Sequence, residues 1–560
     1  MLVCQFACVL VQAQVVFNPA TNNGVYELLD ELASLRVITL NSVVKPYSRI
    51  YIAGKLAEAG HFLAGNTLAG ANSRISREVD FYLRDYSPEL NLLNSKAGIL
   101  SQHGEKPGWG LSFSLADSSL PKQHGGSRIS FDPLSYRYTG KILKIAVSPE
   151  LGGRILVNNN GHVWEISGGG TVSGYLGRHF GFYARVCRTW ESEALSDKSF
   201  LTMEEGNAWT MLKNGSVANT EWRGGISVAW NWGDFGIYRD RPVWGDAQHG
   251  SNILSGHAPA FPFIQLHLTP AKWIEFRYIA GLLRSVYLDS LYLERQTPEG
   301  DRARKYFIGN ITTLTPWKCL QITIGNSVIY SERNINPAFL IPFFFYKSID
   351  QTLSNLSVES GQNNQLFLNV NYRPVNHLTM YSSIFIDDLK MSVLFKKGQH
   401  NEICSKAGFL VAGWPWKNIS LAGEYTRSNP LTYQHYVTPT DYYSSGYCLG
   451  SYLRDNSDEL FFRLVFKPAY RLRLSAEYQV IRHGQDYTHI KWLNNYLLPF
   501  LGQITYKASQ VQLNGSYMLF PRLTLHGGLS ARFSQGDVKY APLVFQGKTY
   551  SVFLGFRVGL

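Results

Sequence analysis

From about residue 139 onward, apolar and polar side chains alternate along the chain in stretches of about ten residues. The clearest stretch spans residues 471–480, where Leu, Leu, Ala, Tyr and Val at even positions alternate with Arg, Arg, Ser, Glu and Gln at odd positions. Residues 366–372 and 378–386 repeat the pattern. A strand with one apolar and one polar face fits a membrane β-barrel, in which the apolar face meets lipid and the polar face lines the lumen.

Eight very short breaks separate pairs of these stretches. Six contain a proline, at positions 270, 316, 374, 415, 468 and 521, and two lack one, at residues 177–179 and 232–234. Proline suits such turns because it presets φ and lacks the N–H that a strand ladder would use. Eight turns join sixteen strands, and an unpaired first strand near 141–147 and a last strand at 550–560 complete the count. The fold class predicted is an all-β, 18-stranded antiparallel outer-membrane barrel, with short turns in the periplasm and long loops outside.

Residues 20–100 have a different pattern, because their apolar residues recur at helical spacing. One helix is predicted at residues 25–35, a second after Pro46 that ends at Gly60, and a third at residues 75–86 that is closed by Pro88. Three short amphipathic helices need one another to bury their apolar faces. We therefore expect a small helical bundle at 20–100, on the periplasmic side of a barrel that occupies 105–560.

The first thirteen residues are apolar and end in Val-Gln-Ala, which fits an export signal peptide at 1–13, although no Lys or Arg lies near Met1. No stretch after the first twenty residues is apolar for the roughly 20 residues that a spanning helix needs. Cys187, Cys319, Cys404 and Cys448 are widely separated and lack CxxC spacing, so no metal site is expected.

Composition changes this interpretation in two respects. Aromatic residues make up 14% of the chain, which a barrel can display toward lipid and in its interfacial girdles. The net charge of +12 suits an acidic partner such as lipopolysaccharide or an acidic polysaccharide. Nucleic acid is disfavoured because Lys and Arg form no cluster. A basic surface without a dedicated partner remains an alternative.

Sugar binding needs aromatic faces that stack on pyranose rings and planar polar groups that satisfy hydroxyls. Three predicted outer loops carry such mixtures, and the alternative for each residue is that it fills the lumen or belongs to the aromatic girdle. The candidate residues are Arg239, Arg241, Trp244 and His249; Tyr433, His435, Tyr436, Tyr442 and Tyr443; and Arg482, His483, Asp486 and Tyr487.

Catalytic patterns are weak. His249-Gly250-Ser251 is the one candidate pair for an acyl hydrolase, but adjacency in sequence does not bring a base within reach of a nucleophile. Asp387 and Asp388 are neighbours on a strand and face opposite ways, so they do not form a glycosidase pair. The chain lacks GxSxG, HExxH and Walker motifs. We expect a protein that is not an enzyme and has no cofactor.

Several short segments carry a resemblance to a known family. They are Tyr-Glu-Leu-Leu-Asp-Glu-Leu-Ala at 26–33, Leu-Asn-Ser at 40–42, Lys-Pro-Tyr-Ser-Arg at 45–49, Val-Trp-Gly at 243–245, Ser-Asn-Ile-Leu-Ser at 251–255, Ala-Pro-Ala-Phe-Pro at 258–262, Asn-Pro at 336–337, Glu-Tyr-Thr-Arg-Ser-Asn-Pro at 424–430, Gly-Tyr at 446–447, Leu-Gly at 449–450 and Asn-Ser-Asp-Glu-Leu at 456–460. In combination they resemble the Wzi-type capsule assembly proteins of Bacteroidota, including gliding-motility relatives. The chain departs from that pattern at residues 246–250, where an Arg-containing run would be expected.

The resemblance implies an 18-stranded outer-membrane barrel with a periplasmic helical bundle, which acts as a lectin that holds capsular or exopolysaccharide on the cell surface. A scaffold for surface motility or protein secretion is the alternative, and copurified protein subunits rather than retained glycan would favour it. The last strand, 550–560, also looks like the carboxy-terminal signal that the barrel-assembly machinery reads during biogenesis.

Overall fold

The computed structural model describes residues 15–19, 23–65, 73–97, 111–115, 127–132, 134–288, 302–331, 335–348, 361–389, 401–489, 498–520 and 522–559. The proposed signal peptide at 1–13 and the last residue, Leu560, lie outside these ranges. Among the described helices, none is long and apolar enough to cross a membrane.

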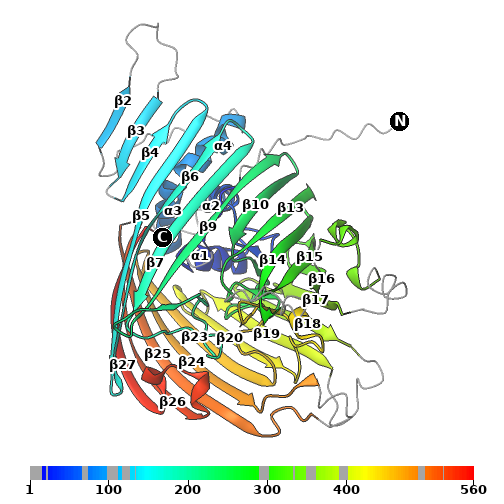
Figure 1. Cartoon of the computed structure of the whole chain (residues 1–560). Helices are drawn as coiled ribbons and strands as arrows, with labels where there is room; N and C mark the ends of the chain where they lie inside the picture. The colour runs from blue at the N-terminus through cyan, green and yellow to red at the C-terminus, as the bar shows by residue number, and fades with distance from the viewer. Residues whose placement is uncertain are drawn as a thin grey trace.

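Eighteen antiparallel strands close into a barrel, which confirms the predicted fold class (Figure 1). The strands are β5 (Leu143–Asn158), β6 (Gly161–Leu176), β7 (Phe180–Glu191), β9 (Val217–Trp230), β10 (Gly233–Asp240), β13 (Phe261–Ala271), β14 (Ile274–Leu288), β15 (Arg302–Trp317), β16 (Leu320–Tyr330), β17 (Asn363–Tyr372), β18 (Leu378–Asp388), β19 (Glu402–Ala412), β20 (Ile419–Ser428), β23 (Ser457–Ala469), β24 (Leu472–Gly484), β25 (Ile504–Phe520), β26 (Leu523–Gly536) and β27 (Lys548–Val558). All eight predicted breaks fall at or between strand ends on one side of the barrel, here called the short-turn end. The opposite side, with the long connections, is the long-loop end.

The barrel closes where β27 pairs with the second half of β5, from Val558↔Leu151 to Ser551↔Asn158. The first half of β5 pairs instead with β4 (Ser135–Thr139), which continues into β3 (Ser127–Asp132) and β2 (Leu111–Leu115). These three strands extend the wall beyond the closure, at the upper left of Figure 1. The first wall strand is therefore longer than the predicted 141–147.

The two faces of the wall differ as the alternation predicts. On β25, the outward residues Val511, Leu513 and Tyr517 are 42–50% exposed. On β17, the inward residues Asn363, Gln365, Asn369 and Asn371 are at most 3% exposed. An apolar outer surface around a polar interior is the distribution that a bilayer requires of a barrel.

Four helices pack at the short-turn end, against the inside of the wall: α1 (Asn23–Ser34), α2 (Arg49–Gly65), α3 (Arg74–Asp85) and α4 (Ser87–Ala97). Their buried apolar residues form one cluster, which includes Val25, Leu32, Leu56 and Val79. One detail of the sequence prediction was wrong, because the second helix continues past Gly60. The third helix ends before Pro88, as predicted, but a fourth helix that was not predicted begins there. Pro88 lies in the first turn of α4, where its missing N–H costs nothing.

The lumen is occupied by two long connections that fold inward from the opposite end. Residues 241–260, between β10 and β13, carry β11 (Val243–Trp244) and β12 (Leu254–Ser255). β11 pairs with β12 on one side and with β1 (Val44–Lys45), from the α1–α2 linker, on the other. Residues 429–456, between β20 and β23, carry the hairpin of β21 (Tyr443–Ser444) and β22 (Tyr447–Cys448). The linker between α1 and α2 and the first inward loop are thus joined through one small sheet inside the barrel.

Candidate functional site

Trp244 illustrates how the predicted sugar-binding residues are placed. Its ring is fully buried in the lumen, with ring centroids 6.2 Å from Phe307 and 6.0 Å from Phe367 on the wall. Its backbone pairs with Val44. Trp244 was predicted to lie in an outer loop, but the loop turns into the barrel, and the buried ring has no free face for a sugar.

The tyrosines of the second inward loop are placed similarly. Tyr433 and Tyr442 are fully buried, with ring centroids 5.8 Å apart. The Tyr433 hydroxyl donates to the Asn252 carbonyl at 2.7 Å, which joins the two inward loops. Tyr443 packs partly buried against the same core, and Tyr487 is 3% exposed and donates to the Pro499 carbonyl at 3.0 Å. Tyr433, Tyr442 and Tyr443 thus pack in the core inside the barrel, and Tyr487 in a separate small cluster.

His249 and Ser251 do not form a catalytic pair. The His249 ring stacks on Phe461 at a centroid distance of 3.7 Å, and its Nε2 lies 3.3 Å from Glu459 Oε1. Ser251 is 5% exposed, and its hydroxyl donates to the Trp244 carbonyl. The serine proton is therefore held by a backbone oxygen rather than by an imidazole, so the geometry that nucleophilic catalysis needs is not present at this pair.

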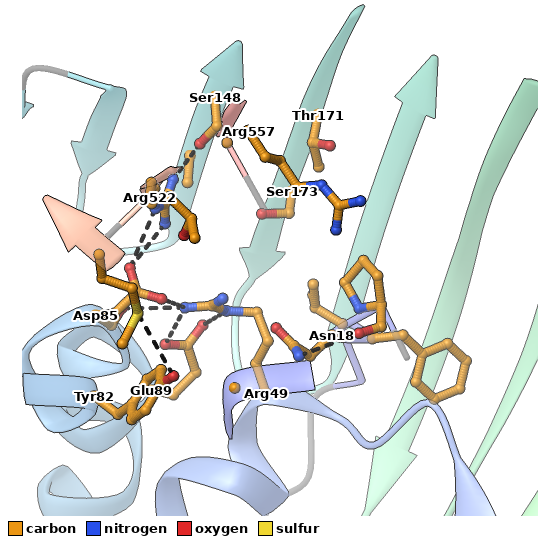
Figure 2. Close-up of a pocket in the computed structure, with 18 of the residues that line it drawn as sticks. Asn18, Arg49, Tyr82, Asp85, Glu89, Ser148, Thr171, Ser173, Arg522 and Arg557 are labelled. Carbon is orange, nitrogen blue, oxygen red and sulfur yellow. Dashed lines mark hydrogen bonds and ion pairs between the residues drawn. The ribbon is translucent and has the colours of Figure 1, made fainter. Parts of the chain in front are cut away.

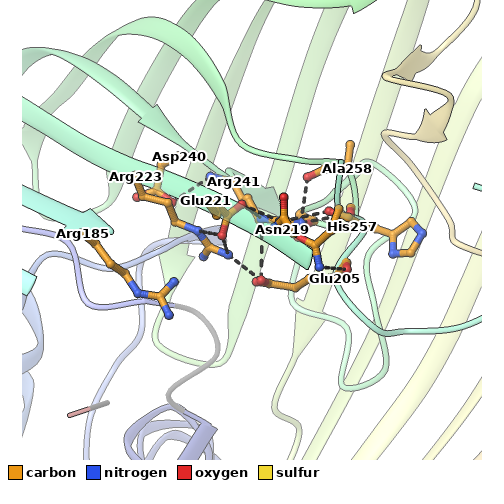
Figure 3. A network of polar contacts seen from close by, with 12 residues as sticks. Arg185, Glu205, Asn219, Glu221, Arg223, Asp240, Arg241, His257 and Ala258 are labelled. Atoms are coloured by element: carbon orange, nitrogen blue, oxygen red, sulfur yellow. Dashed lines mark hydrogen bonds and ion pairs between the residues drawn. The ribbon is translucent and has the colours of Figure 1, made fainter. Parts of the chain in front are cut away.

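Arg241 is the centre of a buried polar network that anchors the first inward loop (Figure 3). Its Nη1 donates to the carbonyls of His257 and Ala258, each at 3.1 Å, and its Nη2 donates to Glu221 at 2.5 Å. Arg223 also pairs with Glu221, at 2.6 Å. Burial, followed by the nearby charge of Arg241, lowers the pKa of His257 to about 4, so this imidazole is neutral at physiological pH.

Besides Asp486, four of the candidate residues lie at or near the outer surface: Tyr436, His435, Arg482 and Arg239. Tyr436 is 56% exposed at the long-loop end, where its ring centroid lies 4.2 Å from that of His435. The Arg482 side chain is 44% exposed and pairs with Asp458 at 2.5 Å. Arg239 lies on the outward face of β10, away from the lumen. These residues remain accessible, but the structure does not bring them together in one site.

His483 and Asp486 differ in exposure although only three residues separate them. The His483 side chain is fully buried, whereas that of Asp486 is 51% exposed, and their side chains lie 3.2 Å apart. Lys539 approaches Asp486 to 2.9 Å from the β26–β27 connection. Here a buried histidine orients a small charged group at the outer surface.

A cavity of about 490 Å³ lies at the short-turn end, between the helices and the wall strands β5–β7 and β24–β27. Figure 2 shows hydroxyl side chains of Ser148, Thr171 and Ser173 on one side of it and the charged ends of Arg49 and Asp85 on the other. Hydroxyl, amide and guanidinium groups are the chemistry that satisfies the hydroxyl and carboxylate groups of an acidic sugar.

Positive charge exceeds negative charge in this cavity. Its lining includes eleven Arg and Lys residues and six carboxylates. Burial favours neutral Asp85, yet Arg522, Arg49 and Arg137 lower its pKa to about 2. Glu27 behaves in the same way, because Arg473 outweighs burial and lowers its pKa to about 2. These two carboxylates are thus ionised and paired with cations of the cavity, and the cations still outnumber the carboxylates of the lining.

Arg557 and Lys144 account for part of that surplus. Both line the cavity, and neither forms an ion pair with a described residue. Sequence reasoning missed this cavity because its lining comes from segments as distant as residues 18 and 559. The alternating polar face of the strands was the available signal, but it does not tell which inward residues surround an empty space. Within the described residues, no cluster of His, Cys, Asp and Glu could hold a metal ion.

Comparisons with known proteins find a similar fold among solved structures but no match among sequences. No protein-family model matches the chain, and no curated protein sequence matches it. Among solved structures, the chain is similar to Wzi of Escherichia coli, described as an outer-membrane protein involved in group 1 capsule assembly and a carbohydrate-binding β-barrel. The TM-score is 0.54 at 12% identity, over 98% of this chain and 100% of Wzi. At this identity the likeness shows the fold alone.

Two further similar structures have lower scores. OccD3 of Pseudomonas aeruginosa matches with a TM-score of 0.42 at 13% identity, over 74% of this chain and 91% of OccD3. OccAB3 of Acinetobacter baumannii matches with a TM-score of 0.42 at 10% identity, over 74% of this chain and 98% of OccAB3.

Proposed function

We propose that this protein is a non-catalytic outer-membrane barrel that binds acidic polysaccharide, capsular or exopolysaccharide, and retains it at the cell surface. The observation that carries the proposal is the cavity at the short-turn end, where eleven cationic side chains face six carboxylates. A polymer with regularly spaced carboxylates gains from such a surplus, and uronic acid hydroxyls match the Ser and Thr side chains beside it. The whole-length likeness to a carbohydrate-binding barrel supports the proposal.

In this proposal the short turns and helices face the periplasm and the long loops face the outside. The exposed residues Tyr436 and Arg482 then lie on the cell surface, where an aromatic ring and a guanidinium provide a separate contact for polymer outside the cell. His435 supports the Tyr436 ring from one side. Lipopolysaccharide surrounds the barrel at this level, and its phosphates suit the exposed Arg239.

The test measures binding of the purified full-length protein to an acidic oligosaccharide, such as a polyuronate, and to a neutral oligosaccharide of the same length. Tighter binding of the acidic ligand, weakened by added salt, supports the proposal. Equal binding of both, or binding of neither, contradicts it.

Variants then locate the contact. Arg557→Gln and Lys144→Gln remove cavity cations that have no ion-pair partner among the described residues, so the fold should survive. Lys548→Gln, at the other end of β27, is the matched control. Loss of affinity in the cavity variants, with the control unchanged, places the ligand in the cavity. Loss in Tyr436→Ala alone moves the contact to the long-loop end.

A further inference from the structure

A short segment after β16, residues 335–346, lies on the outer surface of the barrel. On β14–β16 the outward positions include Tyr278, which pairs with Asn310, and Ile308, which pairs with Val328. The side chains of Tyr278, Ile308 and Val328 are at most 3% exposed, whereas outward residues elsewhere, such as Leu554, reach 65%. Something covers the wall here on the side that faces the membrane.

Aromatic side chains of the segment provide that cover. The Phe343 ring stacks on Phe276 of β14 at a centroid distance of 4.5 Å, and Phe339 stacks on Tyr330 of β16 at 5.1 Å. Figure 1 shows this green part of the chain at the right-hand side of the barrel, beside β15 and β16. The segment thus leaves the long-loop end and folds back over the outside of the wall.

Strand register gives the depth in the membrane at which residues 335–346 contact the wall. Exposed Trp273 marks the short-turn end of β14, and exposed Arg284, paired with Arg304, marks the other. The two are eleven residues apart, 284 minus 273. At about 3.4 Å per residue and a tilt of about 40°, this is about 29 Å across the membrane, close to the roughly 25 Å apolar band of such barrels. Tyr278 lies about half-way, near the middle of the hydrocarbon.

Two asparagines at this depth hold the segment in place. Asn310 pairs with Tyr278 across the sheet, faces outward, and donates from Nδ2 to the carbonyls of Pro342 at 2.8 Å and Phe344 at 2.9 Å. Asn326 donates to Asn310 Oδ1 at 2.7 Å and accepts from the Tyr346 N–H at 3.0 Å. Irregular backbone at membrane depth requires partners of this kind, because water is absent there. The side-chain amides of the wall thus satisfy backbone groups of the segment.

The opposite side of the segment is strongly apolar. Exposed fractions are 40% for Leu340, 45% for Ile341, 67% for Phe343, 45% for Phe344 and 46% for Phe345. No residue between 335 and 346 is charged. A patch of this composition in water would be an aggregation hazard, but it is well suited to lipid chains.

We propose that residues 335–346 form a membrane-embedded flap, held to the barrel wall by Asn310 and Asn326, whose outer face contacts lipid acyl chains near the middle of the bilayer. The proposal rests on the outer-membrane position given under Proposed function. This arrangement accounts for Asn310 and Asn326 on the lipid-facing side of the wall. Burying two amide groups in hydrocarbon costs free energy unless other protein groups form hydrogen bonds with them.

The test uses nitroxide labels on the full-length protein in proteoliposomes, with all six cysteines of the sequence replaced by Ala. Labels are placed at Phe344→Cys in the flap, at Leu554→Cys on the lipid-facing wall and at Asn160→Cys in the exposed β5–β6 turn. Accessibility to oxygen, which concentrates in lipid, is compared with accessibility to a water-soluble nickel chelate. The expected result is that position 344 matches position 554: open to oxygen and shielded from nickel.

The other outcomes separate the possible failures. If 344 is nickel-accessible like 160 while 554 is shielded, the flap proposal fails and the barrel position stands. If 554 is itself nickel-accessible, the outer-membrane position fails. If 344 is shielded from both reagents, a protein partner rather than lipid covers the flap, and the proposal is overturned.

A second pair of variants tests the anchoring. With the label at 344, Asn310→Ala should increase nickel accessibility and label mobility, because the carbonyls of Pro342 and Phe344 lose their donor. Asn369→Ala, on the inward face of β17, is the matched control and should leave both signals unchanged. An unchanged signal in Asn310→Ala would show that this residue does not hold the flap.

Discussion

The Arg522 guanidinium, in the turn between β25 and β26, lies 3.1 Å from the Asp85 carboxylate at the end of α3. The same carboxylate lies 3.4 Å from Arg137 on β4 and 3.8 Å from Arg49 on α2. One acidic side chain therefore connects the helical bundle to the last turn of the barrel and to the strand extension. Its low pKa reflects this arrangement, because three cations favour the charged form against the effect of burial.

Asp85→Asn should loosen the bundle from the wall. A folded-state pKa of about 2, below the usual value near 4, means that the ion pairs contribute stability above about pH 4, which is lost as pH falls through 2. The difference corresponds to about 2 kcal/mol at neutral pH. Limited proteolysis of the helical region at pH 7 should be faster in Asp85→Asn and unchanged in Asp80→Asn, an exposed position on the same helix. Equal rates in both variants would contradict the prediction.

Arg241 is buried and Arg239 is exposed, although only two positions separate them, so replacing each compares the stability cost of a buried and an exposed arginine. Arg241→Met removes one of the two guanidinium groups that pair with Glu221, and it leaves the carbonyls of His257 and Ala258 without this buried donor, so it should cost about 3 to 5 kcal/mol. Arg239→Met, on the exposed outward face, should cost within about 0.5 kcal/mol. Urea unfolding in lipid vesicles, followed by tryptophan fluorescence, measures both. A similar cost for the two variants would show that the Arg241 network does not hold the inward loop.

The strand pattern could be predicted from the sequence because it is local. Alternation reports which face of a strand meets lipid, and a turn proline such as Pro316 or Pro374 marks where the chain reverses. Pro88 shows the limit of local reasoning. Proline is compatible both with the end of one helix and with the first turn of the next, and only the packing of α4 decides between them.

The direction in which the long connections fold could not be predicted, because it depends on distant partners. Trp244 enters the lumen through its pairing with Val44, and Tyr433 is held there by the Asn252 carbonyl. Neither contact is indicated by a repeating pattern of apolar and polar residues in the sequence. A long connection that binds sugar and one that packs inside the barrel contain the same aromatic and basic residue types. Accessible candidates such as Tyr436 and Arg482 therefore could not be distinguished from buried ones by sequence alone.

Asp246, in the first inward loop, should make stability depend on pH in the opposite sense to Asp85. Burial raises its pKa to about 6, partly offset by Lys45 and Arg373. When the pKa of an acid is higher in the folded protein than in the unfolded chain, its protonated form favours folding. For Asp246 this contribution is complete below the pKa of the unfolded chain, near pH 4, and is lost as the pH rises through 6. Asp246→Asn should therefore be more stable than the wild type by about 2 to 3 kcal/mol at pH 8 and equal to it at pH 4.

Melting temperatures of the two proteins, measured across that range in the same detergent, test this. An advantage of Asp246→Asn that is the same at every pH would assign the effect to packing rather than to ionisation. Asn371 provides the structural context, because its Nδ2 donates to Asp246 Oδ2 at 3.2 Å and can equally serve an amide oxygen.

The inward loops should keep the barrel closed to ions. Residues 245–253 join β11 to β12 and contact the wall through several bonds, including Lys406 Nζ to the His249 carbonyl at 2.7 Å and Asn252 Nδ2 to the Cys404 carbonyl at 3.0 Å. The wild-type protein in a planar bilayer should show no nanosiemens steps, and such steps would contradict a closed lumen. Because Trp244 pairs directly with Leu254, residues 245–253 can be replaced by Asn-Gly, a two-residue hairpin turn. This variant removes the bridging residues while keeping the small sheet, and should conduct more than the wild type if those residues close the passage.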